Sequence, residues 1–120
     1  MEKGQFCIDS SFMIDTITKK QKKTKQYETL FMQIKGLMSS SENRISNMAN
    51  FTAAIKASFD FFWVGFYLTE SSDLVLGPFQ GPVACTRIQK GRGVCGSAWS
   101  TEKSIIVGNV HEFPGHIACS

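Results

Sequence analysis

Two neighbouring apolar stretches constrain the fold of this chain more than any other part of it. Residues 61–68 read FFWVGFYL, and such a density of aromatic and branched side chains is typical of a buried strand. A polar turn at Ser71–Asp73 separates it from a second apolar stretch, Leu74–Phe79. We expect this second stretch to return beside the first, so the sequence predicts an antiparallel pair of strands.

The first of these strands has two faces, because successive side chains of a strand point to opposite sides. The predicted sets are Phe62, Val64 and Phe66 on one face, and Trp63, Gly65 and Tyr67 on the other. An aromatic pair that flanks a glycine indicates a shallow apolar hollow on the second face. Two aromatic side chains packed beneath a helix would explain the same residues equally well.

Two helices are predicted before the strands, from apolar residues that recur at helical spacing. Between them, Ser39 to Glu42 resembles a capping box that would begin the second helix. The apolar stripes are Tyr27, Leu30, Phe31, Ile34 and Met38, then Ile45, Met48, Thr52, Ile55 and Phe59. Residues 1–26 show no sustained period, and we interpret them as a variable N-terminal extension of a domain that covers residues 27–120.

The part that follows the strands is rich in glycine, and we expect short elements there. Val83–Ile88 could form a further strand, Lys90–Gly93 a tight turn, and Val94–Glu102 a short helix with Cys95 in its first turn. A strand is predicted for Lys103–Val110, followed by a loop to the end of the chain.

Composition narrows the class of protein. With 120 residues, 42% of them hydrophobic and 19% charged, the chain has the length and composition of one globular domain. The net charge of +3 comes largely from the run Lys19–Lys25, which we interpret as a solvated surface rather than a nucleic-acid site. The sequence shows no membrane-spanning stretch and no signal peptide, so we expect no membrane partner and a cytoplasmic location.

Groups capable of chemistry are concentrated at the end of the chain. Cys85, Cys95 and Cys119 lie there together with both histidines, His111 and His116. Thiols and imidazoles carry out nucleophilic, redox and metal chemistry near neutral pH. Three interpretations remain open from the residues alone: buried structural cysteines, a metal site, or thiol redox catalysis.

The metal interpretation uses His111, His116 and Cys119, whose short spacings suit a zinc-binding loop. The lack of a C-x-x-C pair, the usual local chelate of a cysteine-rich zinc site, argues against it. The redox interpretation needs one attacking cysteine in an accessible loop and others within bridging distance. Cysteines on three separate loops around one hollow could supply them.

Several motifs resemble those of free methionine-R-sulfoxide reductases, enzymes built on a single GAF domain. They are WVGFYL, LGPFQG, GRGVCG and HEFPGHIAC, in the same order and spacing, and they span about residues 61–120. The resemblance implies an α/β, GAF-like domain with a mainly antiparallel central sheet and N-terminal helices packed against it.

The resemblance also implies roles for individual residues. Cys119 would attack the sulfoxide sulfur, Cys85 would resolve the sulfenic acid, and Cys95 would be an auxiliary partner. Trp63 and Tyr67 would line the pocket for free methionine R-sulfoxide. Thioredoxin would reduce the resulting disulfide without any cofactor or metal, and a homodimer is compatible with this prediction. Cys7 matches nothing in these motifs.

Two further expectations complete the prediction. A GAF-type ligand-binding or sensor module without turnover is the alternative, since the fold serves both purposes. The resemblance also implies further strands after the position of Ser120, with acidic residues that hold the substrate's ammonium group. Without them, we expect the 120-residue chain to be poorly stable and nearly inactive.

Overall fold

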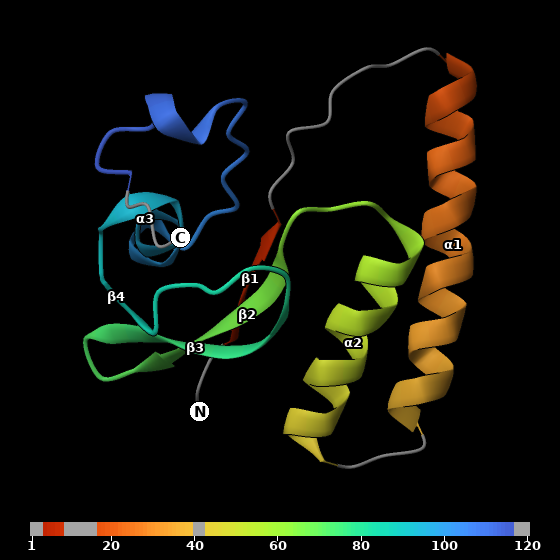
Figure 1. Cartoon of the computed structure of the whole chain (residues 1–120), viewed down its shortest axis with the longest axis horizontal. Helices are drawn as coiled ribbons and strands as arrows, with labels where there is room; N and C mark the ends of the chain where they lie inside the picture. Colours follow the sequence, from red (N-terminus) through yellow and green to blue (C-terminus); the bar gives the residue numbers. More distant parts are fainter. Residues whose placement is uncertain (1–3, 9–16, 40–42, 117–120) are drawn as a thin grey trace.

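The computed structural model describes residues 4–8, 17–39 and 43–116, which form an antiparallel sheet with helices on both sides (Figure 1). The chain order is β1 (Gly4–Ile8), α1 (Ile17–Ser39), α2 (Arg44–Ser58), β2 (Val64–Glu70), β3 (Asp73–Gln80), β4 (Arg87–Gln89), α3 (Gly93–Thr101) and η1 (Val110–Glu112). The predicted α/β class with a mainly antiparallel sheet is confirmed. No helix in these ranges combines the length and the apolar character that crossing a membrane requires.

The sheet has the order β1-β2-β3-β4, and every neighbouring pair is antiparallel. The predicted pair of strands is confirmed as β2 and β3, joined by a turn in which Ser71 has a φ of 55°. Strand β2 begins at Val64, three residues later than we predicted from Phe61, because residues 61–63 carry the chain out of α2. Phe62 is therefore not part of the strand, and its side chain is 60% exposed.

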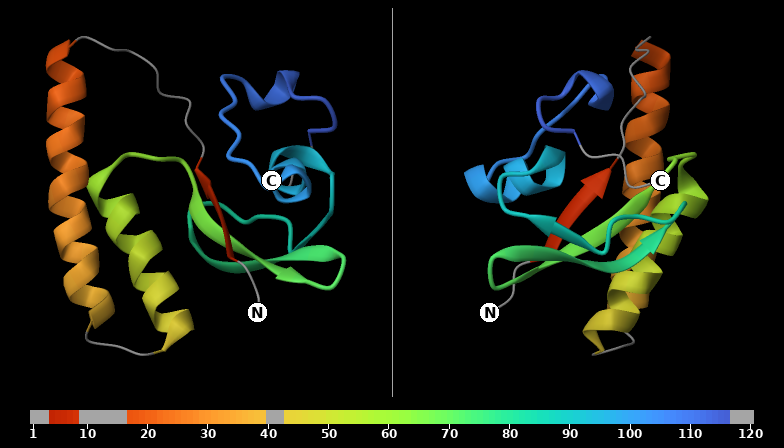
Figure 2. Two further views of the ribbon diagram at one scale, coloured as in Figure 1. Left: turned by 180° about the vertical axis from the view of Figure 1, so that it is seen from behind. Right: turned by 60° about the vertical axis from the view of Figure 1, so that its left-hand side comes forward.

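The two long helices lie on one side of the sheet, α2 against the strands and α1 against α2 (Figures 1 and 2). A core of Leu30, Ile55, Phe61 and Val64 joins these layers. The ring of Tyr27 in α1 lies 4.5 Å from that of Phe59, centroid to centroid, at the end of α2. Burial of this apolar surface stabilises the contact between the helices and the sheet.

The predicted apolar stripe of the first helix is only partly buried. Leu30 is 4% exposed, but Phe31 and Met38 are 64% and 43% exposed. Helix α1 is the outer helix, so only the residues that face α2 find an apolar partner. In the stripe of α2, Thr52 and Ile55 are buried as predicted, whereas Ile45 is 54% exposed near the start of that helix.

The predicted capping box at Ser39–Glu42 is wrong. Ser39 is the last residue of α1, and α2 is capped by Asn43, whose side-chain oxygen accepts a hydrogen bond from the Ser46 backbone N–H at 2.9 Å. Asparagine caps a helix at least as well as serine, so a cap by Ser39, four residues earlier, is not needed.

The proposed limit between an extension (1–26) and the domain (27–120) falls inside α1, which begins at Ile17. Strand β1 belongs to the same sheet, since its five residues Gly4–Ile8 pair with β2.

After the strands in the chain, the predicted short helix is confirmed as α3, and Cys95 is in its first turn. The strand that we placed at Val83–Ile88 is shorter, Arg87–Gln89, which leaves Cys85 in the preceding loop. The strand predicted for Lys103–Val110 is wrong, because residues 103–109 are irregular and Ile106 is 85% exposed. A strand persists only where its backbone groups pair with a neighbour, and in the described part of the chain this segment pairs with none.

The buried sheet residue Leu74 provides a test of this packing. It is fully buried in β3, so Leu74→Ala should lower the free energy of unfolding by about 2–5 kcal/mol, through lost burial and an unfilled cavity. Urea unfolding followed by tryptophan fluorescence measures the change. Ile106→Ala, at an 85% exposed position, is the control and should stay within about 0.5 kcal/mol. Equal losses in the two variants would contradict the burial of Leu74.

Candidate active site

The sheet face that turns away from α1 and α2 carries a row of aromatic rings. The ring centroids of Trp63 and Tyr67 lie 6.0 Å apart, and those of Trp63 and Phe79 lie 5.5 Å apart, with nearly parallel planes. On the opposite face, Val64 joins the core with the helices, and the Phe66 ring lies 5.4 Å from that of Phe51 in α2. For these residues the predicted division into two faces is therefore confirmed.

The Tyr67 side chain connects this aromatic row to the loop that carries Cys85. Its hydroxyl group donates a hydrogen bond of 2.8 Å to the backbone carbonyl oxygen of Cys85. Tyr67 is only 4% exposed, and burial raises the pKa of its phenol above the ordinary value. Tyr67 is therefore held as a neutral donor, and its hydrogen bond fixes the backbone at Cys85.

Cys95 is positioned by the tight turn that precedes α3. Gly91 in this turn has a φ of 82°, and its N–H donates a hydrogen bond of 3.0 Å to the Gly96 carbonyl oxygen. A Cβ atom at Gly96 would lie 2.6 Å from the carbonyl oxygen of Gln89, so no other residue fits without displacing the backbone. The glycines of the GRGVCG motif therefore set the first turn of α3, in which Cys95 lies.

The structure records both Cys85 and Cys95 as disulfide-bonded. The predicted pairing of Cys85 with Cys119 stays a prediction, because Cys119 lies outside the described residues. The predicted role of Cys95 as an auxiliary partner is likewise untested.

The loop that leads toward Cys119 approaches the start of α3. Asn109 caps the short helix η1 by accepting a hydrogen bond of 3.0 Å from the His111 N–H. The rings of His111 and His116 then meet edge to face, with centroids 5.4 Å apart. Gly115 has a φ of 77°, and a Cβ atom placed on it would lie 4.0 Å from the Gly93 nitrogen. The turn at Gly115 thus lies beside Gly93, at the end of α3 that carries Cys95.

The zinc alternative gains no support from the described residues. Among them, no group of three or more histidine, cysteine, aspartate or glutamate side chains is placed to hold a metal ion. The complete set that we considered includes Cys119, which lies outside those residues.

Comparison with known proteins identifies similar sequences. No family model matches the chain. GAF domain-containing protein A of Dictyostelium discoideum is 62% identical to it over 102 residues, which are 84% of this chain and 65% of that protein. Free methionine-R-sulfoxide reductase of Saccharomyces cerevisiae is 44% identical over 100 residues, 77% of this chain and 56% of the reductase.

Solved structures agree with these relatives. The structure of free methionine-R-sulfoxide reductase from Neisseria meningitidis in complex with its substrate matches with a TM-score of 0.77 and 45% identity, over 91% of this chain and 63% of that one. A candidate GAF sensor protein from Burkholderia vietnamiensis matches with a TM-score of 0.78 and 48% identity, over 81% of this chain and 62% of that one. The chain therefore has the GAF fold, and its sequence is similar to those of the free methionine-R-sulfoxide reductases.

This GAF-domain chain spans between 56% and 66% of the lengths of the curated relatives that it matches. Within the described part, the structure brings together Trp63, Tyr67 and the backbone of Cys85. Cys95 lies in α3, the helix that follows β4 in the chain. Cys7, which matched no motif, lies in β1 at the position paired with Gly65.

Sequence analysis missed Phe79 as the third ring of this GAF-domain site. The signal was present in the register, because Phe79 pairs with Gly65 across the hairpin and therefore shares a face with Trp63 and Tyr67. The hydrogen bond between Tyr67 and the Cys85 carbonyl had no comparable signal, since it joins residues that are 18 positions apart and one partner is backbone.

The raised pKa of Tyr67 gives a prediction with a defined sign. The folded chain keeps the phenol protonated at a pH where the unfolded chain, with a pKa of about 10, already releases the proton. The contribution of Tyr67 to the stability of the folded chain is therefore complete below about pH 10, and it is lost as the pH rises through the raised pKa of the folded state. We expect Tyr67→Phe to cost about 1 kcal/mol at pH 7, with a difference from wild type that shrinks above pH 10.

Urea unfolding at pH 7 and at several values above pH 9 measures this difference. Tyr27→Phe is the matched control, because Tyr27 is 44% exposed and its substitution should change neither the stability at pH 7 nor the pH dependence. A constant difference between wild type and Tyr67→Phe across this range would show that the phenol is not held in its neutral form.

Proposed function

We propose that this chain reduces free methionine R-sulfoxide to methionine, with Cys119 as nucleophile and Cys85 as resolving cysteine. The observation that carries the proposal is the hydrogen bond between the Tyr67 hydroxyl and the Cys85 carbonyl oxygen. It joins an aromatic surface that suits a thioether to a cysteine on an adjacent loop. The yeast relative and the Neisseria structure, both named free methionine-R-sulfoxide reductase, support the same substrate.

The proposed reaction balances with two thiols as the source of electrons. The Cys119 thiolate attacks the sulfoxide sulfur, and the sulfoxide oxygen takes up a proton. The sulfur–oxygen bond and the new sulfur–sulfur bond then break as the hydroxyl group passes to the Cys119 sulfur, so that methionine leaves and Cys119 becomes a sulfenic acid. The Cys85 thiolate then attacks the Cys119 sulfur, a disulfide forms and the oxygen departs as water. A dithiol of thioredoxin reduces this disulfide and is itself oxidised, which restores both cysteines without a cofactor.

The aromatic row supports recognition of the substrate's methyl-sulfur end. Sulfur groups make favourable contacts with aromatic rings, and such rings lie on one sheet face, where Trp63 and Phe79 are partly exposed beside the buried Tyr67. We propose Trp63 and Tyr67 as the substrate-binding residues. A methionine inside a peptide carries chain on both sides, so we expect the free amino acid to be preferred.

The loop geometry supports an auxiliary role for Cys95. The turn at Gly115 runs beside Gly93, at the start of the helix whose first turn holds Cys95. A disulfide formed first by Cys119 with one of the two cysteines can pass to the other by thiol exchange. We place this cycle in the cytoplasm, where thioredoxin-type reductants keep thiols reduced.

A second candidate function is ligand binding without turnover. The match to a candidate GAF sensor protein at 48% identity favours it, since the same fold and aromatic surface could hold a small molecule without any redox step. A sensor of this kind would not need its cysteines. The response to cysteine substitution therefore separates the two functions.

Cysteine substitution gives the first functional test. Cys119→Ser should abolish reduction of free methionine R-sulfoxide with a thioredoxin system, because the hydroxyl group is too weak a nucleophile for this attack. The double variant Cys85→Ser with Cys95→Ser should allow about one methionine per chain, after which Cys119 remains as the sulfenic acid. Product methionine and free thiols are measured together, and Cys7→Ser is the control with unchanged rate. Turnover that survives Cys119→Ser would refute the mechanism.

The length of the chain gives the second functional test. The 120-residue chain is compared with an extended form, in which the part of the Dictyostelium relative that follows the matched region is joined to it. Acidic residues implied by the resemblance would then hold the substrate's ammonium group, a contact worth roughly 1.5–3 kcal/mol. We expect kcat/KM for free methionine R-sulfoxide to rise roughly 10- to 150-fold in the extended form. Equal values for both forms would contradict this account of substrate binding.

A further inference from the structure

The indole ring of Trp63 lies in a slot formed by Gly65, Phe79 and Gly81. A Cβ atom at Gly65 would overlap the Cη2 atom of the indole, and would lie 2.8 Å from its Cζ2 atom and 2.5 Å from the Cβ atom of Phe79. A Cβ atom at Gly81 would lie 2.9 Å from the Cδ1 atom of the indole. Both ends of the ring thus rest on glycine backbone, and Phe79 stacks on it at 5.5 Å between centroids.

Among the described residues, the Trp63 indole ring is restrained by packing and not by a hydrogen bond. The indole Nε1 atom is buried, and no described residue accepts a hydrogen bond from it. An indole N–H that is buried usually finds an acceptor, and that bond would fix the orientation of the ring. Here that restraint is absent among the described residues, so the contacts with Gly65, Phe79 and Gly81 set the orientation.

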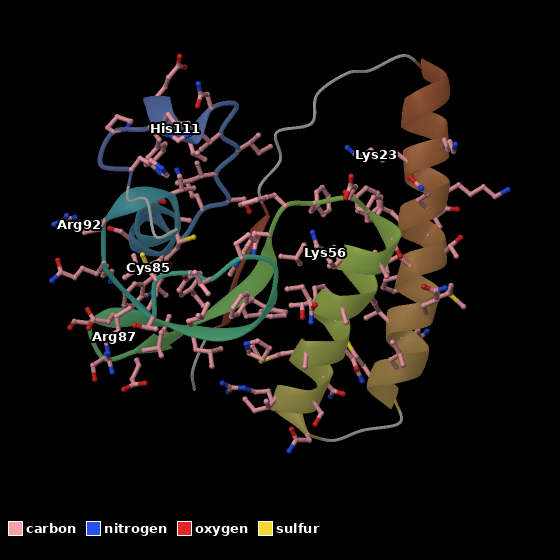
Figure 3. All side chains as sticks on the ribbon, viewed as in Figure 1. Lys23, Lys56, Cys85, Arg87, Arg92 and His111 are labelled. Atoms are coloured by element: carbon pink, nitrogen blue, oxygen red, sulfur yellow. The ribbon has the colours of Figure 1, made fainter. Side chains whose placement is uncertain are left out.

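Lys56 holds the backbone of the two residues that precede Trp63. Its ammonium group donates hydrogen bonds to the backbone carbonyl oxygens of Phe61 and Phe62, the latter at 3.4 Å. Figure 3 shows Lys56 on α2, beside the segment that leads into β2. Gly81, with a φ of 133°, passes so close to the Phe62 carbonyl oxygen that a Cβ atom there would lie 2.7 Å from it.

We propose that Gly65, Phe79 and Gly81 are positioning residues that hold the Trp63 ring in the orientation that recognises the substrate's methyl-sulfur group. The inference rests on the proposed function and adds to it the reason why the strand carries glycine between two aromatic residues. None of the three residues needs to touch the substrate. Their effect passes through Trp63.

The experiment uses Trp99→Phe as its background, because Trp63 and Trp99 are the only tryptophans and Trp63 then gives all the emission. Two variants change the slot in opposite ways. Gly65→Ala adds a methyl group that overlaps the ring, and Phe79→Leu removes the stacked partner but keeps an apolar side chain. Gly108→Ala is the control, since a Cβ atom at Gly108 would meet nothing within 4 Å.

Two measurements are made on each folded variant. Quenching of Trp63 emission by acrylamide in the 120-residue chain measures how far the slot shields the indole ring from solvent. The KM and kcat for free methionine R-sulfoxide, determined in the extended form, measure how the slot affects recognition and turnover of the substrate. We expect more quenching in both slot variants and a KM raised about 3- to 10-fold with nearly unchanged kcat, because a displaced ring loses its contact with the sulfur. The control should match the background in both.

The outcomes separate this inference from the proposed function. If Gly65→Ala does not fold, Phe79→Leu alone decides, since it creates no overlap. Phe79→Leu with unchanged quenching and unchanged KM, beside an active background, would overturn the slot while leaving the reductase function intact. A background form that neither binds nor reduces the sulfoxide would overturn the function, and the inference with it. A slot variant whose kcat falls while its KM is unchanged would also overturn it, because that pattern indicates an effect on the thiols rather than on recognition.

Discussion

Strand β2 is buried on both of its faces, and the rest of the structure follows from this constraint. Val64 and Phe66 must be covered on one side, which α2 does directly and α1 supports from behind. Trp63 and Tyr67 must be covered on the other, where Phe79 and the Cys85 loop lie. The hydrophobic effect thus buries both faces of one strand. One face packs on the helices, and the other carries the residues of the candidate site.

The parts of the fold that could be predicted from sequence are those whose signal is local. The hairpin of β2 and β3 has two stretches rich in aromatic and branched residues around a polar turn, and α3 follows a glycine-rich turn, so both were predicted correctly. The segment 103–109 also contains branched apolar residues, Ile105 to Val107, but it is irregular, because a strand also requires a pairing partner that no local pattern supplies. The exposure of Phe31 has a similar cause, since helical spacing predicts a stripe but not how much of it a neighbour covers.

The candidate site shows the same limit at the level of single residues. Trp63 and Tyr67 could be assigned to one face from the period of the strand alone, and the structure agrees. Phe79 required the register of the hairpin, which is a property of two strands together. The contact of Tyr67 with the Cys85 carbonyl required the path of the loop between β3 and β4, and that path depends on tertiary packing.

The bond from Tyr67 ends on the main chain at residue 85 and not on the sulfur atom. The shape of the aromatic surface is therefore indifferent to which side chain occupies that position. Replacing the thiol at residue 85 would leave both partners of this bond in place. The aromatic surface and the cysteine are thus separable parts of one scaffold, and a change of chemistry at residue 85 need not change the shape of the surface beside it.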